Sequence, residues 1–203
     1  MFDERKHDKK LNIDTRGIVE WPLGVNLEYF RTESTLYSDL DRFIDQYDLL
    51  DQAKLVDFGS GKGRILYYFN YRYQIPTSGI EFSEVAYHQL VNNFASYSEK
   101  HPGLARKIKI YKMRAEDYEI KKDENIFYFF NPFTLKIFKE VLQNIERSLA
   151  ENPRTADIII YYPSVNYTEY LDNYSDFHFL QLVKTPKYFI NSRESFKVYR
   201  YHP

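Results

Sequence analysis

The sequence places KLVDFGSGKGR at residues 54–64, where a short apolar run is followed at once by three glycines at every second position. Lys54–Phe58 predicts a buried strand, and Arg64–Tyr73 predicts a helix that must end before Pro76. The glycines allow the chain to turn sharply and to approach a ligand closely, with the N–H groups of the helix start pointing at it. The spacing matches neither a Walker loop nor the dinucleotide fingerprint, so the loop alone indicates only a site of the nucleotide-cofactor type.

Strands and helices alternate along the rest of the chain. Further strands are expected at Thr77–Glu81, Ile108–Met113, Asn125–Phe130 and Ala156–Tyr162, and two late ones at Phe177–Lys184 and Ser195–Tyr201, after an irregular tyrosine-rich stretch. Helices are expected over Glu33–Leu50, after Ser83 with Val85, Ala86, Leu90, Val91 and Phe94 on the buried side, and after Thr134. This order predicts an α/β, Rossmann-like fold: an open, mostly parallel seven-stranded sheet with helices on both faces and an antiparallel edge hairpin.

Composition sets the class of protein and excludes several kinds of site. The chain has 203 residues, 43% of them hydrophobic, so one domain with its own core is expected; residues 1–30 are an N-terminal extension with a turn at Trp21-Pro22-Leu23-Gly24, and residues 31–203 form the domain. Because there is no cysteine, disulfides, thiolate metal sites and cysteine nucleophiles are excluded. The five histidines show no metal-ligand spacing, so no metal is expected. The charged start and the lack of a long apolar run predict a cytoplasmic protein without a membrane partner.

Two further motifs stand at the ends of predicted strands. Glu81 closes the strand after the glycine loop, where a carboxylate can accept hydrogen bonds from both hydroxyls of a ribose. A solvated loop residue is the alternative, but the glycine loop one unit earlier favours the ribose role. Asn131-Pro132-Phe133 follows the strand expected at the sheet centre. The proline interrupts the hydrogen bonding between strands, so the side-chain amide and the backbone carbonyl of Asn131 would face the crevice at the strand ends. There they could accept hydrogen bonds from an amino group. A turn that merely starts the next helix remains the alternative.

Taken in order, the Asp57–Arg64 loop, Gly79-Ile80-Glu81 and Asn131-Pro132-Phe133 resemble the class I S-adenosylmethionine-dependent methyltransferases over roughly residues 54–162. Together with Ile13-Asp14-Thr15-Arg16-Gly17, they also resemble a group of bacterial methyltransferase-like proteins whose substrates are mostly unassigned. The loop and the asparagine are similar to those of non-SET-domain histone lysine methyltransferases, which suggests an amine acceptor.

The resemblance implies S-adenosylmethionine as cofactor and methyl transfer by residues 31–203 to an unidentified acceptor, a small molecule or a protein amine. It assigns acceptor positioning to Asn131, Pro132 and Phe133. It assigns cofactor contacts to Asp57, Gly59, Ser60, Gly61, Gly63, Glu81, Phe82, Ala115, Glu116 and Asn131. One departure concerns the adenine: Arg114 stands where the family commonly has an acid, and Glu116 and Asp117 are displaced by two and three positions.

Two other functions remain open at this stage. A regulatory module that binds the cofactor without turnover would explain Arg114 and the lack of a clear general base. A nucleic-acid methyltransferase would use Lys62, Arg64, Lys107, Lys109 and Lys112 as a backbone-binding face, but a net charge of −1 does not favour it.

Overall fold

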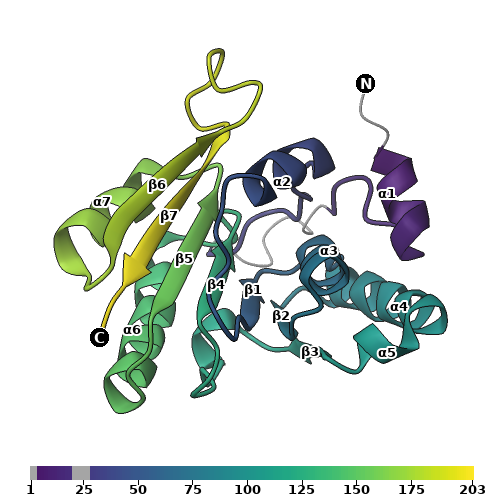
Figure 1. Cartoon of the computed structure of the whole chain (residues 1–203), viewed down its shortest axis with the longest axis horizontal. Coiled ribbons are helices and arrows are strands. Elements are labelled where there is room, and N and C mark those ends of the chain that lie inside the picture. Colours follow the sequence, from purple (N-terminus) through teal and green to yellow (C-terminus); the bar gives the residue numbers. More distant parts are fainter. Residues whose placement is uncertain (1–3, 20–27) are drawn as a thin grey trace.

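The computed structural model describes residues 4–19 and 28–203; the turn expected at residues 21–24 lies outside them. The described elements follow in the order α1 (Glu4–Leu11), α2 (Tyr37–Ile44), β1 (Leu55–Phe58), α3 (Arg64–Tyr73), β2 (Thr77–Glu81), α4 (Glu84–Lys100), α5 (Pro102–Ala105), β3 (Ile108–Lys112), the 3₁₀ turn η1 (Ala115–Asp117), β4 (Ile126–Phe129), α6 (Leu135–Glu151), β5 (Ala156–Tyr161), α7 (Val165–Tyr174), β6 (His178–Lys184) and β7 (Ser195–Tyr201). The chain runs back and forth between strands and helices, as Figure 1 shows.

The strands form one sheet in the order β3-β2-β1-β4-β5-β7-β6. The first five strands in chain order are parallel, and β7 pairs antiparallel with both β5 and β6. The expected Rossmann-like sheet with an antiparallel edge hairpin is therefore confirmed, with β4 at its centre as predicted.

Side chains that alternate along the central strands fill two hydrophobic cores, one on each face of the sheet. Leu55 of β1 and Tyr128 of β4 belong to the core under α2, α3 and α4, whereas Val56 and Phe127 belong to the core under α6 and α7. Figure 1 shows these two helical layers on either side of the sheet. Because β1 pairs in parallel with both β2 and β4, the carboxyl ends of these three strands meet at one edge of the sheet, and the three sequence motifs lie there.

Several helix predictions need correction. The first predicted helix is shorter than expected, since α2 spans only Tyr37–Ile44. Helix α4 does begin after Ser83, whose hydroxyl accepts a bond from the Ala86 amide. Ala86 and Leu90 are buried, but Val85 and Val91 are 50% and 37% exposed, so placing both on the buried side was wrong.

The buried side of α4 consists of Ala86, Leu90, Asn93 and Tyr97, so it also carries a polar residue. The Asn93 side chain accepts a bond from the Asp14 amide and donates to the Lys62 carbonyl. Three helices, α1, α5 and α7, were not predicted at all. Helix α7 lies in the stretch taken as irregular, and Ser164 caps it by accepting from the Tyr167 amide at 3.3 Å.

Candidate functional site

The glycine loop connects β1 to α3 in a conformation that only glycine adopts easily. Gly59, Gly61 and Gly63 have φ values of 77°, 56° and 88°. A Cβ atom on Gly59 would lie 2.4 Å from Cβ of Pro132, and one on Gly61 would lie 2.3 Å from Cγ2 of Thr32. Side chains at these two positions are therefore excluded by both backbone strain and space. The hydroxyl oxygen of Ser60, in the same loop, is buried and has no hydrogen-bond partner within the described residues.

Glu81 ends β2 with its carboxylate turned into the loop. One oxygen accepts from the Gly61 amide and the other from the Ser83 amide, both at 2.7 Å. Burial raises the pKa of Glu81, and these amide bonds offset part of that rise. Since a carboxylate has about four acceptor positions, Glu81 can still accept further hydrogen bonds.

Asp57 lies on the neighbouring strand β1 and is buried. Burial, together with the nearby charge of Glu81, holds the pKa of Asp57 well above its usual value. Two of the three acidic residues predicted to contact the cofactor, Asp57 and Glu81, are therefore brought to the same edge of the sheet.

A second wall is formed by Phe82 and by the turn η1. The guanidinium of Arg114 lies over the Phe82 ring, 5.4 Å from its centroid. The turn brings Glu116 back towards this wall, where its carboxylate accepts from Nε of Arg114 and from the Tyr29 hydroxyl. Burial opposes ionisation of Glu116, but the bonds from Tyr29 and Arg114 outweigh it, so the pKa of Glu116 lies below its usual value. Glu116, which stands two positions beyond the place where the family commonly has an acid, thus reaches the site and is paired with Arg114.

Asn131 has a positive φ of 40° at the end of β4. Its Nδ2 donates to the carbonyl of Tyr162, while its Oδ1 is buried with no partner in the part of the chain that is described. The carbonyl of Pro132 accepts from the Phe30 amide at 2.9 Å. Phe133 is buried in the core beside Tyr29. Asn131 is thus the member of this motif that presents an unused polar atom.

The loop between β6 and β7 contacts Tyr162, whose carbonyl is bonded to Asn131, and no pattern in the sequence predicted this connection. Nδ2 of Asn191 donates to the Tyr162 hydroxyl at 2.8 Å, and the Arg193 guanidinium lies 4.3 Å from the centroid of the same ring. This loop projects beyond the carboxyl end of β5 at the top of Figure 1. Its tip carries Phe189 and Ile190, which are 89% and 90% exposed.

Residues 29–35, which we call the strap, lie directly over the glycine loop. Tyr29 pairs with Phe133 in an isolated antiparallel bridge, and Thr32 pairs with Val19 in another. The space left between the strap, Gly59 and Glu81 is about 30 Å³. Sites for small ligands usually enclose ~300–1,000 Å³, so the strap fills most of the volume that a cofactor would need.

The two basic residues of the glycine loop are buried and hold the N-terminal segment. Lys62 donates to the carbonyls of Arg16 and Gly17. Arg64 donates to Oγ1 of Thr15 and to the carbonyl of Thr35, both at 2.7 Å. Neither cation is available to a nucleic-acid backbone, so their proposed place in a binding face was wrong.

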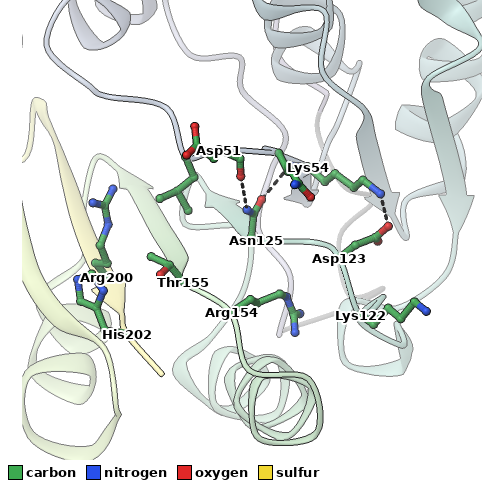
Figure 2. Close-up of a pocket in the computed structure, with 11 residues that line it drawn as sticks. Asp51, Lys54, Lys122, Asp123, Asn125, Arg154, Thr155, Arg200 and His202 are labelled. Atoms are coloured by element: carbon green, nitrogen blue, oxygen red, sulfur yellow. Dashed lines mark hydrogen bonds and ion pairs between the residues drawn. The ribbon is translucent and has the colours of Figure 1, made fainter.

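A larger cavity of about 620 Å³ lies at the opposite edge of the sheet, near the amino ends of β1, β4 and β5 (Figure 2). Lys54 pairs there with Asp123, as the dashed line shows. Arg200 pairs with the buried carboxylate of Asp157 at 2.7 Å, and Arg154 donates to backbone carbonyls. These three cations are already engaged by other groups of the protein, so we do not assign this cavity to a ligand.

Neither a membrane span nor a metal centre is found in the described ranges. No helix there is both long and apolar enough to cross a bilayer. No group of three or more His, Asp or Glu side chains in residues 4–19 and 28–203 is arranged to hold a metal ion.

Comparison with solved structures identifies the fold. The chain is similar to an RNA methyltransferase from Salinibacter ruber in complex with S-adenosyl-L-homocysteine, at 16% identity over 83% of this chain and 92% of that one, with a TM-score of 0.53. It is similar to the glycopeptide N-methyltransferase MtfA complexed with S-adenosyl-L-methionine, at 8% identity over 82% and 94%, with a TM-score of 0.61. It is also similar to the human methyltransferase 10 domain containing protein, at 12% identity over 97% and 91%, with a TM-score of 0.58.

No protein-family model and no curated protein matches the sequence. At these identities the structural likeness defines the architecture: the chain has the class I methyltransferase fold. Within that fold, the glycine loop, Glu81 and Asn131 all lie at the carboxyl edge of the sheet, where ligands of open α/β folds bind.

Proposed function

We propose that this protein is an S-adenosylmethionine-dependent methyltransferase. The observation that carries the proposal is the Glu81 carboxylate, which is buried at the end of β2, faces a glycine loop and keeps unused acceptor positions. A ribose diol would supply two donors to this carboxylate. The unpartnered Ser60 hydroxyl and the loop that admits no Cβ atom also fit a ligand with polar groups that lies close to the backbone.

Each wall of the site would hold one part of the cofactor. Gly59, Gly61 and Gly63 would lie under its methionine moiety, near Asp57. Glu81 would bind the ribose. The adenine would contact Phe82, Ala115 and Glu116. Arg114 would hold Glu116 in place through its ion pair and would not exclude the adenine.

The chemistry of transfer comes mostly from the cofactor, which when bound supplies a methyl group on a positively charged sulfur. The protein then has to align an acceptor and exclude water. Oδ1 of Asn131 would accept a hydrogen bond from an amino group, because it is buried and has no partner among the described residues. Such a bond directs the nitrogen lone pair towards the crevice, so an amine nitrogen is the acceptor that this atom favours.

Proton removal does not require Glu116. Its pKa is lowered by its partners, so it is a weak base in this setting. Asp117 is exposed, and solvent at the rim can take one proton from the amine before its lone pair attacks and another from the nitrogen after it has been methylated. The lack of a dedicated base is therefore compatible with turnover.

The test is titration calorimetry with S-adenosylmethionine and, separately, S-adenosylhomocysteine. We expect micromolar binding that Glu81→Ala abolishes, whereas Glu84→Ala, a control that removes an exposed carboxylate three residues away, leaves it unchanged. Labelled methyl incorporation from the cofactor into cell extract would then identify the acceptor class.

No heat with either ligand, in protein shown to be folded, would refute cofactor binding. Binding without any methyl incorporation would instead favour a regulatory module. Incorporation into RNA or DNA would favour the nucleic-acid alternative, although Lys62 and Arg64 would take no part in it.

A further inference from the structure

Tyr29 of the strap places its hydroxyl between a hydrogen-bond donor and an acceptor on η1. The Ala115 amide donates to the hydroxyl oxygen at 2.9 Å. The hydroxyl in turn donates to the Glu116 carboxylate at 2.5 Å. Burial, reinforced by Glu116, raises the pKa of Tyr29, so the hydroxyl keeps the proton that it donates. One oxygen atom thus satisfies both polar groups that point from η1 into the site.

The Tyr29 ring lies against a surface that suits a flat aromatic ligand. Its centroid is 5.3 Å from that of Phe82, and the Arg114 guanidinium is 5.7 Å from it. Arg114 also lies over Phe82. Aromatic rings and a guanidinium plane form the kind of surface on which nucleobases stack.

Adenine offers the same pair of hydrogen-bonding functions on one edge. Its N1 accepts a hydrogen bond, and its exocyclic amino group donates one. The amide of Ala115 and the carboxylate of Glu116 are therefore complementary to adenine as well as to a phenol. We propose that Tyr29 is an internal substitute for the cofactor's adenine, and that the strap must withdraw from the site before the cofactor binds. This inference rests on the proposed function, because it takes an adenine nucleoside as the competing ligand.

Thr32 blocks the other half of the site in the same way. Its Cγ2 lies only 2.3 Å from the place that a Cβ atom on Gly61 would take, over the part of the loop assigned to the methionine moiety. Tyr29 and Thr32 therefore cover both ends of the cofactor position, and both must move. The end of the strap is held at Thr35. The Thr35 hydroxyl is hydrogen-bonded to the Tyr128 hydroxyl, and the Thr35 carbonyl accepts a hydrogen bond from Arg64.

The cost of opening the strap is part of the apparent affinity for the cofactor, since only the open fraction binds. Removing the Tyr29 hydroxyl leaves the Ala115 amide and the Glu116 carboxylate without that partner in the closed form only. Tyr29→Phe should therefore bind S-adenosylhomocysteine about tenfold more tightly than the wild type. Tyr174→Phe is the matched control, because Tyr174 is the last residue of α7 and is 73% exposed.

The experiment is calorimetry of the wild type and both variants with S-adenosylhomocysteine, after thermal unfolding has shown that each is folded. Tighter binding by Tyr29→Phe alone supports the inference. Equal or weaker binding by Tyr29→Phe, with the wild type binding, overturns it and leaves the proposed function intact. Absence of binding by all three proteins overturns the proposed function and this inference with it.

Hydrogen exchange tests the movement separately. With saturating S-adenosylhomocysteine, amides of residues 29–35 should exchange faster, because the bond from the Phe30 amide to the Pro132 carbonyl is released. Amides of the glycine loop should exchange more slowly as the ligand covers them. Slower exchange within the strap would mean that it closes over the ligand, which contradicts displacement.

Discussion

Arg64 offers the sharpest test of how the N-terminal segment is attached to the domain. It is the first residue of α3 and is only 4% exposed, although its side chain carries a charge. It donates to Thr15 and Thr35, pairs with Glu4 at 2.5 Å, and lies 4.2 Å from the centroid of the Tyr37 ring. Arg64→Met keeps most of the apolar volume and removes every one of these polar contacts.

The expected loss follows from how deeply these contacts are buried. Breaking a buried charged pair costs ~3–5 kcal/mol, because the remaining partner is left without its counter-charge. The side chain of Glu4 is 25% exposed and can be solvated in the variant, so the lower end of that range applies. We expect the free energy of unfolding to fall by about 3 kcal/mol, which for a chain of this size lowers Tm by ~6–12 °C.

Urea unfolding followed by circular dichroism measures this loss. Arg72→Met is the control, because Arg72 is exposed on the same helix and should change the free energy of unfolding by less than ~0.5 kcal/mol. If Arg64→Met lowers the free energy of unfolding no more than Arg72→Met does, then the contacts of Arg64 do not hold the N-terminal segment in place.

Three further outcomes are expected. Gly61→Ala should lower the free energy of unfolding by about 2 kcal/mol in urea titrations, because it adds backbone strain at φ 56° and a collision with Thr32; an unchanged midpoint would contradict the loop geometry. Asp57 has a folded-state pKa above its unfolded value, so it binds a proton more tightly when folded, and the wild type should lose stability as the pH rises from about 4 towards that raised pKa. Asp57→Asn lacks this loss, so its unfolding free energy relative to the wild type should be higher at about pH 8 than at about pH 4, and superimposable pH profiles would refute the pKa shift. Asn131→Ala should change S-adenosylhomocysteine affinity by less than about twofold in calorimetry and reduce labelled methyl transfer at least ~100-fold; loss of binding in folded protein would mean that Asn131 holds the cofactor.

Local signals in the sequence were sufficient to locate most strands and several helices. The predicted bounds of α3 and β2 coincide with the observed ones; Gly63 stands directly before α3, and Pro76 separates α3 from β2. The apolar run of β4 likewise indicated a strand covered on both faces, and it lies at the sheet centre. Helix α7 was missed although Tyr167, Leu171 and Tyr174 recur at helical spacing, because asparagine, aspartate, threonine and valine residues of low helix propensity stand between and beside them.

The residues that close the site were not recognisable in the sequence. Tyr29 and Glu116 are 87 positions apart, and neither the composition nor the spacing around Tyr29 indicates that its hydroxyl reaches η1. Lys62 and Arg64 were interpreted as a possible cationic face because their residue types are usually exposed. In the folded chain the N-terminal segment covers both, so their charges serve internal bonds.

The sequence by itself determined the order of strands and helices, the glycine loop and the acidic residue that follows it. These features depend on turn geometry and on the period of apolar residues, which act over a few neighbouring positions. Only the tertiary structure decided which side chain lies over the loop, which cations are available and where Glu116 points. Those outcomes depend on contacts between segments far apart in the chain, and such contacts form only when both sheet faces are packed and the N-terminal segment lies against the carboxyl edge.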